Sequence, residues 1–133
     1  MKDSTLKVTK ALPNAAANNN TDSIDLHVEA GGFDNKFRRA FVLVTFPALS
    51  DHTNTSVTNL ITLQDSAEAS ANFANTAPLI QCQVVGVAST GSVATTFKIP
   101  LPPVTRRYIR FNQLVPTNGG IASNATVTYE VVV

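Results

Sequence analysis

The chain has 133 residues, of which ten are basic and nine acidic, so its formal net charge at pH 7 is +1 and only 14% of its residues are charged. A nucleic-acid-binding protein normally carries a concentrated basic surface, so this balance argues against a nucleic-acid partner. No apolar run approaches the roughly 18 residues that span a bilayer, so no membrane partner is expected. A chain of this length fits one domain, residues 1–133, with a core of its own.

Threonine and valine are abundant, with 16 and 15 residues, whereas methionine occurs once and tryptophan is absent. Because β-branched residues favour strands, we expect an all-β protein with under about 10% helix. Cys82 is the only cysteine, which excludes an internal disulfide. Its neighbours Ile80 and Val84 are apolar, so we expect Cys82 to pack as a small buried side chain rather than to act as a nucleophile.

Alternation of apolar and polar side chains with a period of two, typical of a strand with one buried face, recurs between turn-forming residues. The expected strands, in chain order, cover residues 5–9, 23–29, 37–46, 57–64, 79–88, 93–99, 106–115 and 125–133. Residues 10–22, which contain Pro13 and the asparagines at 18–20, are expected to form an extended loop or arm. Residues 65–78 are the longest irregular stretch, with one short helical turn around residues 67–71.

Seven or eight strands joined by turns, with no helical connection, predict a two-sheet antiparallel sandwich in a single domain. We expect the jelly-roll type. The alternation alone fits an immunoglobulin-like topology equally well, because it does not reveal which strands pair.

Residues 40–44 are apolar on both strand faces, which distinguishes them from the alternating segments. Such a block is typical of a central strand that is covered on both sides. A lone sandwich of this size covers one side only. We therefore expect Phe41 and Leu43 to take part in an interface, most simply with a second copy of the chain.

The segment 106–115 concentrates three arginines within five residues and alternates large apolar with charged or polar side chains. Its apolar face carries Ile109, Phe111 and Val115, and its polar face carries Arg106, Tyr108, Arg110 and Asn112. Alternation places Arg107 on the opposite face from Tyr108. Two interpretations stay open: a solvated strand face with ion pairs to neighbouring acids, or an interface in which Arg106, Arg107, Tyr108 and Arg110 contact a protein partner, since Arg and Tyr are favoured there.

No pattern in the sequence predicts catalysis, a cofactor or a metal. His27 and His52 lie far apart and lack the further ligands that a jelly-roll metal site needs. No serine lies in a Gly-x-Ser-x-Gly turn, and the glycine pairs at 31–32 and 119–120 are not followed by the Lys-Ser/Thr of a phosphate loop. We therefore expect a non-enzymatic protein with no catalytic, cofactor-binding or metal-binding residues.

Several segments, in this order and spacing, together resemble a known viral family. They are Thr5-Leu6-Lys7-Val8, Ser23-Ile24-Asp25-Leu26, Ile61-Thr62-Leu63-Gln64-Asp65-Ser66, Ile99-Pro100-Leu101-Pro102 and Arg107-Tyr108-Ile109-Arg110, followed by the β-rich C-terminus. The chain resembles the capsid cement (decoration) proteins of tailed bacteriophages, of the small jelly-roll kind. The asparagine run at 18–20 departs from that family's pattern, so its role is open.

This resemblance implies a protein of the virion that is made in the cytoplasm of the host bacterium and sits on the outer capsid surface. It implies a homotrimer that binds the major capsid protein between capsomers and resists the outward pressure of packaged DNA. The alternative is a carbohydrate-binding, lectin-like sandwich. Such modules usually depend on exposed aromatic residues, and the chain has no tryptophan and two tyrosines.

Overall fold

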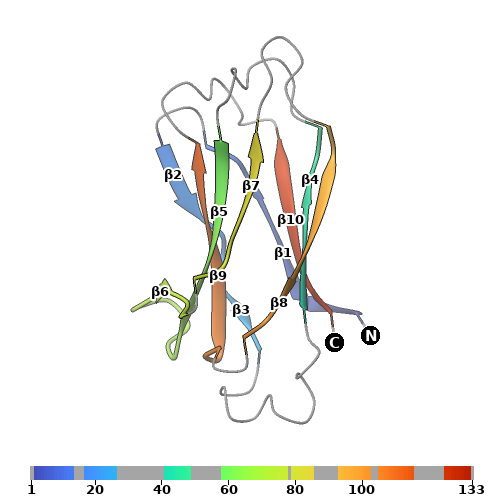
Figure 1. The fold of residues 1–133 in the computed structure, drawn as a ribbon. Helices are drawn as coiled ribbons and strands as arrows, with labels where there is room; N and C mark the ends of the chain where they lie inside the picture. Colours follow the sequence, from blue (N-terminus) through green and yellow to red (C-terminus); the bar gives the residue numbers. More distant parts are fainter. Residues whose placement is uncertain are drawn as a thin grey trace.

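The computed structural model of the protein describes residues 2–13, 17–26, 41–48, 58–77, 79–85, 93–102, 105–115 and 125–132. All regular secondary structure in these ranges is strand, arranged as two antiparallel sheets that face each other (Figure 1). The prediction of an all-β sandwich is therefore confirmed.

The four-stranded sheet consists, in spatial order, of β1 (Lys2–Ala11), β10 (Thr126–Val132), β4 (Phe41–Phe46) and β8 (Thr95–Pro100). The six-stranded sheet has the order β2 (Ala17–Asn20), β9 (Tyr108–Val115), β5 (Thr58–Ser66) and β6 (Ala74–Asn75). Two further strands belong to it: β3 (Ile24–Asp25) pairs with β9, and β7 (Gln81–Val85) pairs with β5. The block at 40–44 thus contributes to a central strand, β4, as its pattern predicted.

The strand pairing decides between the two topologies that the sequence left open. The strands β2 and β3 pair with the same strand, β9, and act as one, and β6 has only two residues. The described ranges therefore contain eight main strands. The first pairs with the eighth, the second with the seventh, the third with the sixth and the fourth with the fifth. This nested order is that of a jelly roll rather than of an immunoglobulin-like sandwich.

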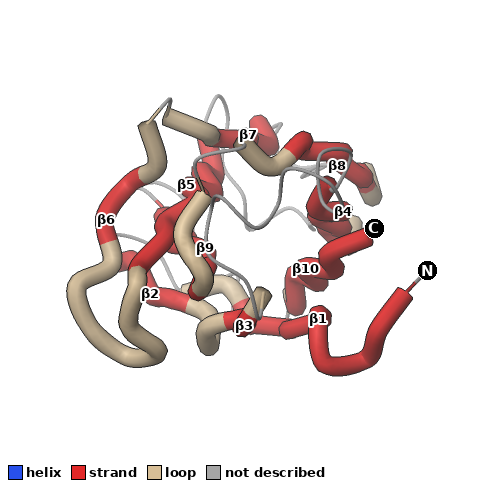
Figure 2. The backbone as a smooth tube through the Cα atoms, turned by 90° about the horizontal axis from the view of Figure 1, so that it is seen from below, coloured by secondary structure: helices blue, strands red, loops and turns tan. Residues whose placement is uncertain are grey.

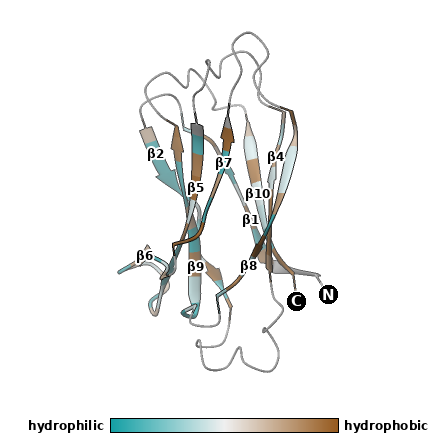
Figure 3. Cartoon of the chain, viewed as in Figure 1, coloured by the Kyte–Doolittle hydropathy of each residue, from teal (hydrophilic) through white to brown (hydrophobic). Residues whose placement is uncertain are grey.

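The core lies between the sheets and is built by the inward residues of the alternating strands. Along β9 the odd-numbered residues are buried and the even-numbered residues are half-buried, as the sequence pattern predicted. Figure 3 shows hydrophobic and hydrophilic residues succeeding one another along the strands. The ring of Phe111 stacks on that of Tyr129 from the opposite sheet, with a centroid distance of 4.3 Å, which packs the two layers together. Seen along the strands, β1 and β3 lie side by side and close one edge of the sandwich (Figure 2).

Two sequence-based expectations about irregular segments differ from the structure. Residues 10–22, expected as a loop or arm, include the end of β1 and all of β2, whose asparagines pair with β9. Residues 67–71 form bends rather than a helical turn, so that prediction was wrong. Asn72 then takes a φ of 58°, which asparagine tolerates, and its Nδ2 donates to Glu68 Oε1 at 2.7 Å. The local side-chain bond stabilises a bend where a helix would need continued backbone bonding.

Candidate interaction site

Arg106 precedes β9 and is held by Asp65 at the end of β5. Its Nε and Nη2 donate to Asp65 Oδ1 at 3.2 and 2.9 Å, and its backbone N donates to Oδ2 at 3.0 Å. The Asp65 side chain is 9% exposed and the Arg106 side chain 40% exposed. One carboxylate therefore fixes both the backbone and the side chain of Arg106, while one edge of the guanidinium stays in solvent.

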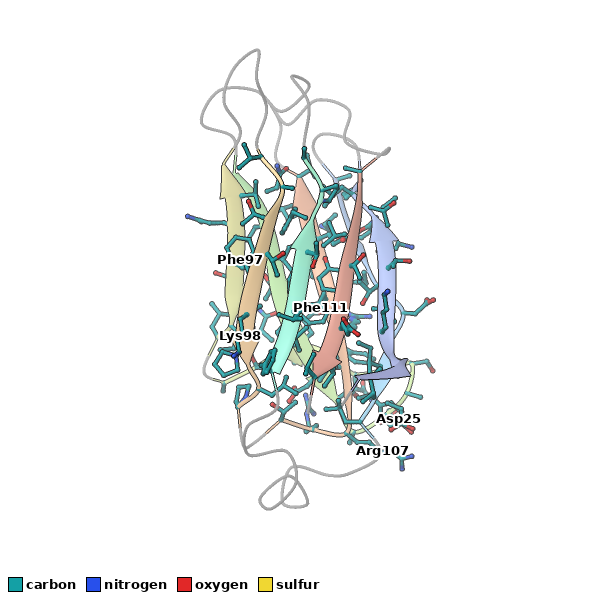
Figure 4. All side chains as sticks on the ribbon, turned by 90° about the vertical axis from the view of Figure 1, so that its right-hand side faces the viewer. Asp25, Phe97, Lys98, Arg107 and Phe111 are labelled. Atoms are coloured by element: carbon teal, nitrogen blue, oxygen red, sulfur yellow. The ribbon has the colours of Figure 1, made fainter. Side chains whose placement is uncertain are left out.

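Arg107 forms a second ion pair, with Asp25 of β3. Its Nε and Nη2 donate to the two carboxylate oxygens at 2.8 and 3.0 Å, which is a bidentate arrangement. Both residues are labelled in the lower part of Figure 4. The backbone N of Leu26 also donates to the carbonyl of Arg107 at 2.9 Å. Because both side chains of this ion pair are about one third exposed, at 39% and 31%, solvent screens it more than the Arg106 pair.

The prediction that Arg107 lies on the opposite strand face from Tyr108 was wrong. Its guanidinium lies 5.1 Å from the ring centre of Tyr108, beside the residue from which alternation should have separated it. The physical reason is that β9 begins at Tyr108, so Arg107 lies before the strand and does not follow its alternation. Asp25, its partner, is in register with Tyr108 on the neighbouring strand.

Arg110 lies inside β9 and points to the outer face of the six-stranded sheet. Its Nε donates to Gln64 Oε1 at 2.8 Å, and its guanidinium stacks 4.5 Å from the ring centre of Phe73. All three arginines of the cluster thus make contacts within the chain. This arrangement matches the interpretation of a solvated strand face with ion pairs to neighbouring acids. Their exposed edges are still available, so a contact of Arg106, Arg107, Tyr108 or Arg110 with a partner stays a prediction.

Phe41 and Leu43 lie on the outer face of the four-stranded sheet, where both are half-buried, whereas Val42 and Val44 are fully buried in the core. The Nζ of Lys98 sits 4.2 Å above the Phe41 ring, so an alkyl chain and an ammonium cover part of that ring. Neighbouring side chains therefore cover only part of the outer face of the apolar block.

A row of four threonines crosses the same outer face, next to Leu43. The strand registers place one threonine from each strand side by side: Thr9, Thr128, Thr45 and Thr96. Threonine side chains are short and stiff, so this part of the sheet is flat, uncharged and low in side-chain entropy. Such a surface is suited to packing against another protein.

A buried polar network joins the two sheets behind β9, and sequence reasoning missed it. The hydroxyl of Tyr129 donates to Gln113 Oε1 at 2.7 Å, and Gln113 Nε2 donates to Asn19 Oδ1 at 2.8 Å and to the carbonyl of Ala11 at 3.0 Å. Tyr129 and Gln113 are completely buried. Burial raises the pKa of the Tyr129 hydroxyl, with a smaller contribution from Cys82, so it remains a proton donor in this network.

Cys82 is buried, as expected, and its pKa is raised from 9.0 to about 12 by burial. A thiol with this pKa stays protonated at neutral pH, which fits a packing role rather than that of a nucleophile. His27, His52 and the glycine pairs at 31–32 and 119–120 lie outside the described residues.

An open pocket of about 230 Å³ lies beside the Arg106–Asp65 pair. Its lining residues are Asp65, Asn75, Thr76, Ala77, Pro102, Thr105 and Arg106. The lining combines hydroxyl, amide and ion-paired groups with the apolar side chains of Ala77 and Pro102. In the described ranges, no group of three or more His, Cys, Asp or Glu side chains is placed to hold a metal ion. The same ranges contain no helix that is long and apolar enough to cross a membrane.

No protein-family model and no curated protein matches the chain. Among solved structures, one similar chain comes from a structure titled Desmodium yellow mottle tymovirus, with a TM-score of 0.47 and 10% sequence identity. The match covers 94% of this chain and 81% of that chain. A likeness at this level carries no conclusion about function, so the jelly-roll assignment stands on the strand pairing alone.

Proposed function

We propose that this protein is a non-enzymatic structural protein of a virus particle, and more narrowly a capsid cement (decoration) protein of a tailed bacteriophage. In this role it binds the outside of the head, between capsomers of the major capsid protein, and stabilises the shell against internal DNA pressure. It is made in the cytoplasm of the host and ends on the outer surface of the virion.

The observation that carries this proposal is that segments that resemble the family lie together in the folded chain and are joined by hydrogen bonds. Asp25 of the second segment binds Arg107 of the last, and Gln64 of the third binds Arg110. The fourth segment, Ile99 to Pro102, joins them where the Pro102 carbonyl accepts hydrogen bonds from Thr105, directly before Arg106. Residues far apart in sequence thus form one hydrogen-bonded unit at one end of the six-stranded sheet. The segments that carry the resemblance are therefore parts of one local structure in this chain, and this supports the proposal.

The outer face of the four-stranded sheet is our choice for protein–protein contact, with Phe41 and Leu43 at its centre. A homotrimer is the assembly we propose. Light scattering coupled to chromatography should give a mass near three chains, and Leu43→Arg should lower it. The matched control is Thr96→Arg, which adds the same charge on the edge strand of that face, farther from the apolar block. A monomer at micromolar concentration would count against self-assembly.

Head binding tests the function itself. Heads of the phage that encodes this chain, prepared without it, are mixed with the purified protein and sedimented. We expect saturable binding at a fixed copy number per head and a higher temperature of DNA release. Arg107→Ala should weaken binding if the arginine cluster touches the shell. Lys10→Ala serves as the control, because Lys10 lies opposite the buried Val127 and so does not belong to the outer face of the four-stranded sheet. Failure of the parent protein to co-sediment would refute the proposal.

A further inference from the structure

The outer face of the six-stranded sheet is unusually rich in uncharged amides. By strand register and burial, its outward residues on β2, β9, β5, β6 and β7 include Asn18, Asn20, Asn112, Gln64, Asn75, Gln81 and Gln83. Thr62 stands among them. A surface selected only for solubility usually carries mixed charges. Here the middle of the face carries amides from five strands, the guanidinium of Arg110 and the half-buried side chains of Leu60 and Leu114.

Lateral hydrogen bonds hold these amides in fixed orientations. Asn112 Nδ2 donates to Asn20 Oδ1 at 3.0 Å, and Gln64 Nε2 donates to Asn75 Oδ1 at 3.0 Å. Gln81 Nε2 donates to the Thr62 hydroxyl oxygen at 3.1 Å. Side chains that are already ordered lose little entropy when a ligand binds, which favours recognition.

These bonds leave donors and acceptors facing solvent side by side. Within the described part of the chain, Asn112 Oδ1 has no donor and Asn20 Nδ2 has no acceptor, although the two amides are bonded to each other. Asn75 Nδ2 and the terminal nitrogens of Arg110 likewise have no acceptor there. The face therefore offers alternating donors and acceptors at neighbouring strands. A hydroxyl group acts as donor and acceptor at once, so it can pair with either.

The pocket described above continues this face, since Asn75 both lines the pocket and bonds to Gln64. At about 230 Å³ it has room for roughly eight water molecules, which suits one sugar ring and is below the size of most ligand pockets. Its two charged groups, Asp65 and Arg106, are paired with each other, so the pocket presents no net charge. An anionic ligand would gain no net attraction here.

We propose that this amide face, together with the pocket, is a binding site for neutral oligosaccharides. The chain uses fixed amides, hydroxyls and one guanidinium in place of the exposed tryptophan and tyrosine platforms that sugar-binding sandwiches usually present. This inference can be tested apart from the capsid proposal, because sugar binding is measured on the isolated protein and the proposed trimer contact lies on the opposite sheet.

The test is a titration of the ¹⁵N-labelled full chain with maltohexaose, cellohexaose, mannohexaose and chitohexaose, each to about 10 mM, which detects a Kd as weak as about 1 mM. We expect at least one of them to shift the side-chain amide signals of Asn20, Asn75 and Asn112 in a saturable way. Asn112→Leu should weaken that binding about tenfold, the effect of losing one or two hydrogen bonds. Asn75→Ala, an exposed change that leaves the core intact, should weaken it as well, and Thr45→Ala on the opposite sheet should not.

Two outcomes would overturn the inference. The first is the absence of saturable amide shifts with all four oligosaccharides. The second is binding that Thr45→Ala weakens as much as Asn112→Leu does. If no sugar binds and Asn112→Leu abolishes head binding, the amide face contacts protein instead, and the capsid proposal survives without this one.

Discussion

Both faces of the six-stranded sheet carry amide side chains, which are buried on the inner face and reach solvent on the outer face. On the inner face, Gln113 is completely buried and bonded to three groups, and Asn59 is completely buried with no partner for either amide atom among the described residues. On the outer face, Asn112 and Gln64 are bonded sideways and remain in reach of water. We infer from this difference that the burial of an amide, rather than its residue type, determines how much its hydrogen bonds contribute to stability.

Gln113→Leu should have the largest effect. The change leaves the fully buried Tyr129 hydroxyl without its acceptor and the oxygen Oδ1 of the half-buried Asn19 without its donor. An unsatisfied buried group costs about 1–3 kcal/mol. We expect a loss of about 3 kcal/mol in the free energy of unfolding, measured by denaturant titration with circular dichroism. Tyr129→Phe in the same background should recover part of the loss, because it removes the stranded hydroxyl. If the single variant is as stable as the parent, the inner network does not connect the sheets energetically.

Asp65→Ala should have the second largest effect and lower the free energy of unfolding by about 2 kcal/mol. Asp25→Ala should lower it by about 1 kcal/mol or less. Both remove the carboxylate of an arginine ion pair, but the Asp65 side chain is 9% exposed and that of Asp25 is 31% exposed. Thermal unfolding of the two variants side by side measures the difference directly. Equal losses would contradict the claim that burial sets the value of a polar contact.

Asn59→Leu should stabilise the protein, by about 1 kcal/mol. Leucine has nearly the same shape and removes a buried amide that has no hydrogen-bond partner among the described residues. The measurement is again the free energy of unfolding, with Asn59→Asp as a control that should destabilise strongly, because it buries a charge. Lower stability of the leucine variant would mean that the amide has a partner in the folded protein.

Asn112→Ala should have the smallest effect on folding, about 0.5 kcal/mol or less, because water replaces its bond to Asn20. The same measurement applies. A loss as large as that of Gln113→Leu would remove the distinction between the two faces.

The sequence pattern predicted the inner and outer faces of β9 and the central position of β4 because alternation and apolar blocks are local signals. It did not predict β2, whose asparagines lack a strand pattern and become a strand only by pairing with β9. Nor did it predict that Asp65 holds Arg106, a contact across 41 residues that depends on the register of β5 against β9. The arginine cluster was visible from its spacing. Its partners are set by tertiary pairing, which periodicity does not encode.

A density map of the phage head offers the most direct test of the central proposal. Heads prepared without this chain are imaged before and after the purified protein is added. The account predicts new β-sandwich density on the outer surface, between capsomers, with the four-stranded sheet in contact with protein and the amide face turned to solvent. Heads that show no added density, or density on the inner surface of the shell, would contradict it.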